Sequence, residues 1–277
     1  MDVTPAGDLF EEALAAAQDA AGHLGLRTRN SMVLHRSNNV VVRINDVVLK
    51  VGTDHVRIRR EVEVSRDAAR AGGPVLTPHA DPLEVGRFVV STWPYLRADS
   101  TAPDDGAAAR ALRELHRALA QTTVSLPRLN DRFGEVRHLL DDERLTGALD
   151  VEGRACLRAA LDRVSAAAAE SPTELALHVE PHDGNRLTAG GAVVYIDLEA
   201  VCIGPVEWDL AYFPDAVAEE VWPDHDRRLR RRLHVGVSAC VSTYCWRHVT
   251  SRPSDSEMRW HAEHHLGLVR DAVEEDG

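Results

Sequence analysis

Acidic and amide side chains are concentrated in one segment of the chain, residues 176–213. In it the stretch HVEPHDGN contains Glu180 and Asn185, and Asp197 follows after the apolar run AVVYI. Phosphoryl transfer requires a carboxylate that orients the attacking hydroxyl, and an amide oxygen and a second carboxylate that hold Mg²⁺ against the phosphates. Mg²⁺ prefers such oxygen ligands. The spacing therefore predicts a nucleotide and magnesium site in which Asn185 and Asp197, at the two ends of a short hairpin, converge on one ion.

A lone lysine is the second candidate for this chemistry. Of the 32 basic residues, 31 are arginine and only Lys50 is lysine. By itself this count fits codon bias and chance as well as a site that requires a compact ammonium instead of a guanidinium fork. Its position favours the site, because Lys50 lies at the end of a β-branched run, where kinase-like enzymes place the lysine that contacts the α- and β-phosphates. Glu61 or Glu63, on a predicted helix that follows, should pair with it.

The hydrophobic pattern predicts a β-rich first part that could hold these residues. Its expected elements are a helix at 7–24, strands at 32–36, 39–44 and 46–51, a helix at 55–71, and strands at 75–80 (VLTPHA) and 87–93. The rest is mostly helical, with helices expected at 107–120, about 133–147, 151–170, 207–221, 224–249 and 254–274, and short strands around the motif in 175–200. We therefore expect an α+β protein with an N-terminal nucleotide-binding lobe, 1–95, and a helical lobe, 96–277, that carries the catalytic loop and the acceptor site.

The composition of the chain excludes several classes of binding partner. The formal net charge is −12, which argues against nucleic acid because duplex binding requires a basic face. It is compatible with a cationic small-molecule ligand. The four cysteines have no CxxC spacing, so neither a disulfide scaffold nor a zinc site is expected. The N-terminus lacks the features of a signal peptide, and no apolar run is long enough to span a bilayer. We expect a cytoplasmic protein with no membrane partner.

The motifs then show a family resemblance. HVEPHDGN, followed by YIDLEA and GPVEWDLA, resembles the aminoglycoside phosphotransferase family, which shares the two-lobed protein-kinase fold. That family typically shows His-Gly-Asp-x-His-x-x-Asn, a strand that ends in Ile-Asp-Trp/Phe-Glu, and Gly-x-Pro-x-x-Asp-Leu-Ala. The resemblance places His178 and His182 on family positions and makes His182 part of the catalytic loop. It implies that Asn185 and Asp197 are Mg²⁺ ligands and that Asp209 is a buried structural acid.

The sequence departs from the family motif at the catalytic base. Glu180 stands where the family has aspartate, and Val179 where it has glycine. Glutamate is a carboxylate of similar pKa, but its extra methylene moves the oxygens by about one bond length, and misplacement on that scale can cost about 10²-fold in rate. Asp183 is a rival acid. The kinase-type gap of five residues to Asn185 favours Glu180 as the base.

The same resemblance implies the nucleotide contacts. Glu61 matches the family's Arg-Glu pattern and is preferred over Glu63, which lies on a different face of the helix. Asn39 matches an asparagine common in the family, in the turn Ser37-Asn38-Asn39 between the first two strands, although a plain hairpin turn explains this turn equally well. Thr92 and Trp93 lie in the linker whose backbone binds the nucleobase in the family; for the Trp93 side chain, ordinary packing is an alternative. The linker does not separate ATP from GTP.

Together these features predict a small-molecule kinase that transfers the γ-phosphoryl group of ATP or GTP, with Mg²⁺, to a hydroxyl of an antibiotic-like acceptor. An aminoglycoside or a basic peptide antibiotic would suit the acidic composition. The alternatives are a metabolic kinase for an amino alcohol or sugar, a kinase-like binding module without turnover, and hydrolysis of the nucleotide by water. Two other signals are interpreted as surface features: the histidines at 261, 264 and 265, and the basic run 227–232, which we expect to pair with acids such as Asp224 and Asp226.

Overall fold

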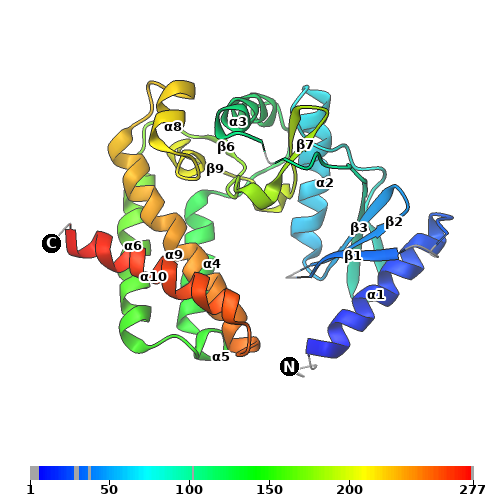
Figure 1. The fold of residues 1–277 in the computed structure, drawn as a ribbon, viewed down its shortest axis with the longest axis horizontal. Coiled ribbons are helices and arrows are strands. Elements are labelled where there is room, and N and C mark those ends of the chain that lie inside the picture. Colours follow the sequence, from blue (N-terminus) through cyan, green and yellow to red (C-terminus); the bar gives the residue numbers. More distant parts are fainter. Residues whose placement is uncertain (1–5, 28–30, 37–38, 102, 276–277) are drawn as a thin grey trace. The chain divides into compact units, whose positions relative to one another are not determined.

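The computed structural model describes residues 6–27, 31–36, 39–101 and 103–275. The chain forms two compact units, which are described separately (Figure 1). The first consists of residues 1–125 and 180–201, and the second of residues 126–179 and 202–277. The expected boundary after residue 95 therefore falls inside the first unit. The segment with Glu180, Asn185 and Asp197 belongs to the unit that contains the N-terminal sheet.

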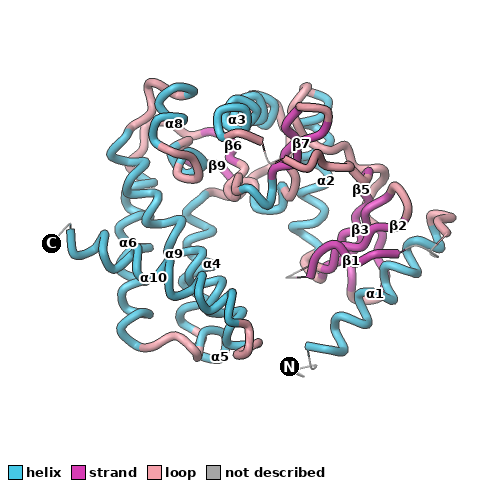
Figure 2. The backbone as a smooth tube through the Cα atoms, viewed as in Figure 1, coloured by secondary structure: helices cyan, strands magenta, loops and turns pink. Residues whose placement is uncertain are grey.

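An antiparallel sheet with strand order β1-β2-β3-β5-β4 is the centre of the first unit. Its strands are β1 (Ser31–Arg36), β2 (Val40–Ile44), β3 (Val47–Gly52), β4 (Leu83–Val85) and β5 (Phe88–Pro94). Alternate residues of β2 are buried, as expected for a strand with one covered face. Helix α1 (Ala6–His23) packs against this face, and Figure 2 shows it running beside the sheet. Its buried residues in this core are Ala13, Ala16, Ala17, Ala20 and Ala21. The predicted turn at Asn45 is present, with φ of 55°.

The predicted strand at 75–80 is wrong. Within the described part of the chain this segment forms one isolated bridge, from Val75 to Tyr195, and the strand that pairs with β5 is β4. Pro74 and Pro78 explain the difference, because proline has no N–H to donate and so interrupts a ladder of hydrogen bonds. The N–H of His79, which follows, is instead donated to the carbonyl of Thr92 in β5, at 2.9 Å.

Two helices and a hairpin complete the first unit. Helix α2 (His55–Arg70) is capped by Asp54, whose side chain accepts the N–H of Arg57, and α3 (Asp105–Leu119) packs against it. The hairpin consists of β7 (Arg186–Ala189) and β8 (Ala192–Tyr195), flanked by the single turns η2 (Asp183–Asn185) and η3 (Leu198–Ala200). The Tyr195 hydroxyl donates to the carbonyl of Ala108 in α3, at 2.9 Å. These contacts connect the motif-bearing hairpin to the N-terminal part of the chain.

The second unit is helical apart from a strand pair. Strand β6 (Leu175–Leu177) pairs with β9 (Cys202–Gly204), and the helices are α4 (Leu129–Asp141), α5 (Glu143–Thr146), α6 (Val151–Ala169), α7 (Glu207–Leu210), α8 (Asp215–Val221), α9 (Arg227–Ser251) and α10 (Ser256–Glu275). Helix α9 packs against α6 and α10, the long helices coloured green and red in Figure 1. Two predicted helices are each split in two: one at Asp142, which caps α5, and the other at Pro214, which precedes α8. Among the described helices, none is both long and apolar enough to cross a membrane.

The basic run 227–232 lies in α9 and the three histidines lie in α10. Arg227 pairs with Glu219 at 3.0 Å and Arg230 with Asp215, so the basic run has acidic partners. These partners are not the expected Asp224 and Asp226, and Arg230 is buried. In α10 the exposed Trp260 ring stacks on His264, with ring centroids 4.9 Å apart. All four cysteines are free thiols.

His265, next to this stack, should make stability depend on pH. Its ring is partly buried, and Nδ1 is buried with no hydrogen-bond partner among the described residues. Burial, with smaller contributions from the charges of His264, His261 and His234, lowers the pKa of His265 to about 4. The unfolded chain, with an ordinary pKa near 6.5, therefore binds more protons than the folded protein between these values, so stability falls as the pH drops below about 6.5.

We expect His265→Leu to remove part of this acid sensitivity. The loss of unfolding free energy between pH 7 and pH 5, measured by urea denaturation, should be smaller in the variant than in the wild type. Equal losses in the two proteins would contradict the prediction.

Candidate active site

The β7–β8 hairpin brings Asn185 and Asp197 together at its base, as the spacing predicts. The carbonyl of Asn185 accepts the N–H of Ile196, the neighbour of Asp197, at 3.1 Å. The Asn185 amide nitrogen donates to the carbonyl of Glu180 at 3.0 Å, which leaves its Oδ1 as the atom suited to a cation. Asp197 has a left-handed backbone, with φ of 66° and ψ of 59°, and starts the turn η3. Two oxygen-bearing side chains from the ends of one hairpin thus reach the same part of the unit.

Strand β3 places Lys50 beside them. Its side chain is 9% exposed, and Nζ lies 2.9 Å from Glu61 Oε2, 2.5 Å from Asp197 Oδ1 and 2.9 Å from Glu199 Oε2. Burial acts to lower the pKa of Lys50, but the three carboxylates outweigh it and raise the pKa well above its ordinary value. The chain's only lysine is therefore a charged ammonium enclosed by three acids.

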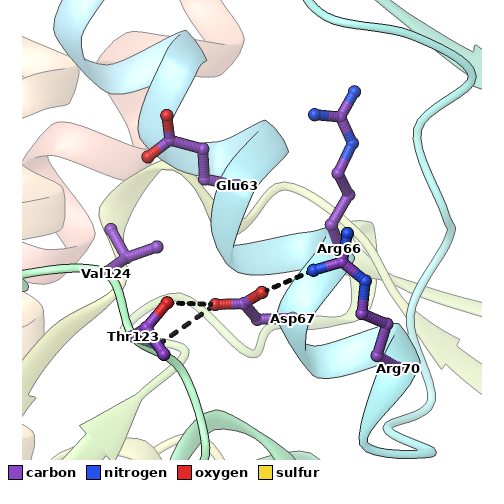
Figure 3. A pocket seen from close by; sticks show the side chains of 6 residues that line it. All are labelled: Glu63, Arg66, Asp67, Arg70, Thr123 and Val124. Carbon is purple, nitrogen blue, oxygen red and sulfur yellow. Dashed lines mark hydrogen bonds and ion pairs between the residues drawn. The ribbon is translucent and has the colours of Figure 1, made fainter.

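The glutamate that pairs with Lys50 is Glu61. Burial raises the pKa of Glu61 to about 7, against the attraction of Lys50, because the carboxylate is almost completely shielded from water. Glu63 is exposed and lines a separate pocket of about 280 Å³ on the same helix (Figure 3). In that pocket Asp67 accepts hydrogen bonds from the Thr123 N–H at 3.1 Å and the Thr123 hydroxyl at 3.2 Å. These bonds fix α2, and with it Glu61, to the segment that follows α3.

The start of the motif is held by Asp209 in the second unit. This fully buried carboxylate accepts the N–H groups of His178 and Val179, each at 2.8 Å, and Trp208 Nε1 donates to the Val179 carbonyl at 2.9 Å. Val179 has φ of 80°, a conformation that is costly for a β-branched residue and persists only where its surroundings impose it. These contacts therefore hold Val179 in a backbone conformation that glycine, the residue typical of the family at this position, adopts without strain.

Removing the Asp209 carboxylate should be strongly destabilising. In Asp209→Ala two buried N–H donors lose their acceptor, at about 1 to 3 kcal/mol each, so we expect a loss of about 2 to 6 kcal/mol in unfolding free energy. Asp209→Asn keeps the shape and one acceptor oxygen, and should lose roughly half as much. Urea denaturation of the three proteins measures this order; equal stability of Asp209→Ala and the wild type would contradict it.

Arg186, which was not predicted from the sequence, fixes the loop that runs from Glu180 to the β7–β8 hairpin. Its side chain is 1% exposed; Nε donates to the Pro181 carbonyl at 2.7 Å, and the guanidinium pairs with Asp183 at 3.0 Å and Asp105 at 3.1 Å. His182 Nδ1 accepts the N–H of Gly184 at 3.1 Å. The loop that carries Glu180 and His182 is thus fixed by hydrogen bonds within the first unit.

A cavity of about 960 Å³ is lined by most of the residues that we expected to bind nucleotide or metal or to act in catalysis. Its walls include all of them except Thr92, namely Asn39, Lys50, Glu61, Trp93, Glu180, His182, Asn185 and Asp197. Thr92 is buried in β5, and Trp93 Nε1 donates to Ser91 Oγ at 2.9 Å. Ser37 and Asn38, the rest of the turn that the family resemblance connects with the nucleotide, lie outside the described residues.

Glu199 is a second residue of the site that was not predicted from the sequence. It lies two positions after Asp197, in the quoted motif YIDLEA, and the turn η3 brings its carboxylate back to Lys50. Among the described residues, Glu61, Asp197 and Glu199 are the group of acids whose oxygens lie within 4.8 Å of one another, close enough to share a cation. Lys50 Nζ already lies among these oxygens. The donors that remain for a metal ion are therefore Asn185 Oδ1 and the second carboxylate oxygens of Asp197 and Glu199, which are the kind of ligand that Mg²⁺ prefers.

Comparisons with known proteins identify the family and the fold. The model of the phosphotransferase enzyme family matches residues 28–242. Among solved structures, a choline/ethanolamine kinase family protein from Mesorhizobium loti is 19% identical, with a TM-score of 0.67 over 92% of this chain and 94% of that one. A thermostable mutant of aminoglycoside phosphotransferase APH(4)-Ia is 15% identical, with a TM-score of 0.65 over 92% and 98% of the two chains. The amicoumacin kinase hAmiN is 12% identical, with a TM-score of 0.64 over 95% and 96%. No curated protein matches the sequence.

The fold and the site define a phosphotransferase with the protein-kinase-like α+β fold, an enzyme that transfers a phosphoryl group to an alcohol. The chain belongs to the phosphotransferase enzyme family, which confirms the resemblance drawn from its motifs and the predicted fold class.

Proposed function

We propose that this protein is a small-molecule kinase that uses ATP or GTP with Mg²⁺ to phosphorylate a hydroxyl of a polar, antibiotic-like acceptor. The observation that carries the proposal is the contact of the only lysine, Lys50, with Glu61, Asp197 and Glu199 in a cavity that also contains Glu180 and Asn185. The proposal draws further support from similar structures, which contain AMP-PNP, Ca²⁺ and Ami in the case of the amicoumacin kinase, and GDP and kanamycin in another case.

Each residue has a role that its position suits. Lys50, oriented by Glu61, neutralises the α- and β-phosphates. Trp93 and the segment 94–98 line the cavity and would border the nucleobase, whereas Thr92, which is paired within β5 and lies off the cavity wall, would not contact it. Asn185 and Asp197 would hold Mg²⁺, which neutralises charge on the phosphate oxygens when bound.

Glu180 orients the acceptor hydroxyl and takes its proton as the hydroxyl oxygen attacks the γ-phosphorus and the nucleoside diphosphate leaves. His182 and Arg186 hold the loop from which Glu180 projects.

The acidic composition favours a cationic acceptor. A net charge of −12 attracts cations over distances of about a Debye length, roughly 10 Å at moderate salt. Aminoglycosides and basic peptide antibiotics are positively charged. Amino alcohols, which are the acceptors of the alternative metabolic kinase, are positively charged as well. A cytoplasmic enzyme of antibiotic resistance is the cellular role we propose.

A mass-shift screen tests the proposal directly. The purified protein is incubated with Mg²⁺ and ATP or GTP in the presence of aminoglycosides, basic peptide antibiotics, choline, ethanolamine or sugars, and each acceptor is analysed by mass spectrometry. We expect a phosphorylated product from at least one cationic antibiotic, and none from the Asp197→Asn variant. Tight nucleotide binding without any product would favour the binding module, product from amino alcohols alone the metabolic kinase, and nucleotide consumption without product hydrolysis by water.

A further inference from the structure

We propose that Asn39 and Gly52 are positioning residues that hold the carboxylate of Glu199 in place beside Lys50, an inference that rests on the proposed function. Asn39 precedes β2, Gly52 ends β3, and Glu199 lies in η3. The role is to fix an acid whose charge would otherwise drive it away from its neighbours.

One oxygen of Glu199 is held from two sides. Its Oε2 lies 2.9 Å from Lys50 Nζ and accepts a hydrogen bond from Asn39 Nδ2, also at 2.9 Å. Two donors on Oε2 fix the rotation of the carboxylate and leave Oε1 as the oxygen to face a cation. The Glu199 side chain is only 17% exposed, so this geometry is protected from competition by water.

The surrounding charge makes a neutral donor necessary. Glu61, Asp197 and Glu199 bring three carboxylates to one ammonium, so the repulsion among them is not fully balanced by Lys50. Like charges at this separation in a partly buried site disfavour the ionised form and push the side chains apart. The Asn39 amide adds a hydrogen bond to Glu199 without adding another charge.

Gly52 provides the space in which the Asn39 amide lies. The β2–β3 register pairs Val40 with Val51, which places Asn39 next to Gly52 across the hairpin. A Cβ added to Gly52 would lie 2.1 Å from Asn39 Oδ1 and 3.2 Å from its Cγ, so the amide would have to move, and it would also lie 2.9 Å from Ile58 Cδ1. Glycine is therefore required here by the close approach of a side chain, which directs Nδ2 of that amide toward Glu199.

A double-mutant cycle tests the proposal through metal binding. The affinity for Mn²⁺ in the presence of saturating AMP-PNP is measured by electron paramagnetic resonance for Asn39→Ala, Gly52→Ala and the double variant. Each single change should weaken Mn²⁺ binding by about 10- to 100-fold, as is typical when the partner of a metal ligand is removed. The double variant should be no weaker than the worse single one, because both changes remove the same hydrogen bond.

Two further variants make the test specific. Asn39→Asp keeps the shape but replaces the donor with a fourth carboxylate, so it should weaken binding more than Asn39→Ala does. Gly134→Ala, where an added Cβ has no neighbour within 4 Å, is the control and should bind Mn²⁺ like the wild type. Thermal unfolding confirms that each protein is folded.

The outcomes separate this inference from the proposed function. Wild-type affinity in Asn39→Ala, or losses in the double variant equal to the sum of the single losses, would overturn the role of Asn39 and Gly52 alone. A wild-type protein that binds neither Mn²⁺ nor AMP-PNP would overturn the proposed function as well.

Discussion

Replacing Lys50 with methionine is expected to lower kcat/KM for phosphoryl transfer by about 10²- to 10³-fold, the usual cost of removing one preorganised group that stabilises transition-state charge. Lys50 Nζ is the cation at the centre of Glu61, Asp197 and Glu199, and methionine fills its space without a charge. Steady-state kinetics with the acceptor found in the mass-shift screen measures the effect.

The Lys50→Arg variant is the matched control for charge. It keeps the positive charge but presents a planar fork in a space shaped for an ammonium, so we expect most of the activity to be lost in this variant as well. The chain uses arginine at its 31 other basic positions, so lysine at position 50 suggests a specific requirement. Wild-type activity in Lys50→Arg would contradict that requirement.

Measuring the unfolding free energy of the Lys50 variants shows whether a loss of activity comes from lost catalysis or from a loss of folding. Lys50→Met leaves the buried Glu61 without its partner, and breaking a buried ion pair typically costs about 3 to 5 kcal/mol. Replacing both residues, in Lys50→Met/Glu61→Met, should restore most of that stability but none of the activity. Recovery of activity in the double variant would contradict the proposed role of Lys50.

The residues of the site were predictable where a short stretch of chain fixes the geometry. The five-residue gap from Glu180 to Asn185 lies within one loop, and the hairpin returns the chain directly to Asp197. The same holds for Lys50 at the end of a hairpin strand and for Glu61 on the next helix, because helical periodicity separates it from Glu63.

Features that depend on tertiary contacts were not predictable in this way. The stretch VLTPHA has the composition of a strand, but whether it pairs depends on the N–H groups that it can offer a neighbouring strand. Pro78 within it and Pro74 just before it have no N–H to donate. In the sequence nothing distinguishes Arg186 from the thirty other arginines. Its role depends on its burial against Asp105, which precedes it by 81 positions. The positive φ of Val179 is imposed by Asp209, 30 positions further on, and not by the valine itself.

Glu180→Gln should lower kcat by about 10²- to 10⁴-fold, the range of contributions from a general base, with little change in KM for the nucleotide. The amide keeps the shape of the side chain but cannot accept the proton of the acceptor hydroxyl. Glu180 lies on the cavity wall, and its backbone is held by Asn185 through the 3.0 Å hydrogen bond to the Glu180 carbonyl. The substitution therefore removes a proton acceptor from a loop that stays in place.

Glu180→Asp and Asp183→Asn show whether the loop is built for glutamate at this position. Because Arg186 and Asn185 fix the backbone, shortening the side chain withdraws the carboxylate by about one bond length, so we expect Glu180→Asp to lose up to about 10²-fold in kcat. Asp183, the rival acid, has a side chain that is 86% exposed and pairs with Arg186, so Asp183→Asn should change kcat only a few-fold. A faster Glu180→Asp enzyme would mean that the loop retains the geometry of the family's aspartate. A larger loss in Asp183→Asn than in Glu180→Gln would assign the base to Asp183.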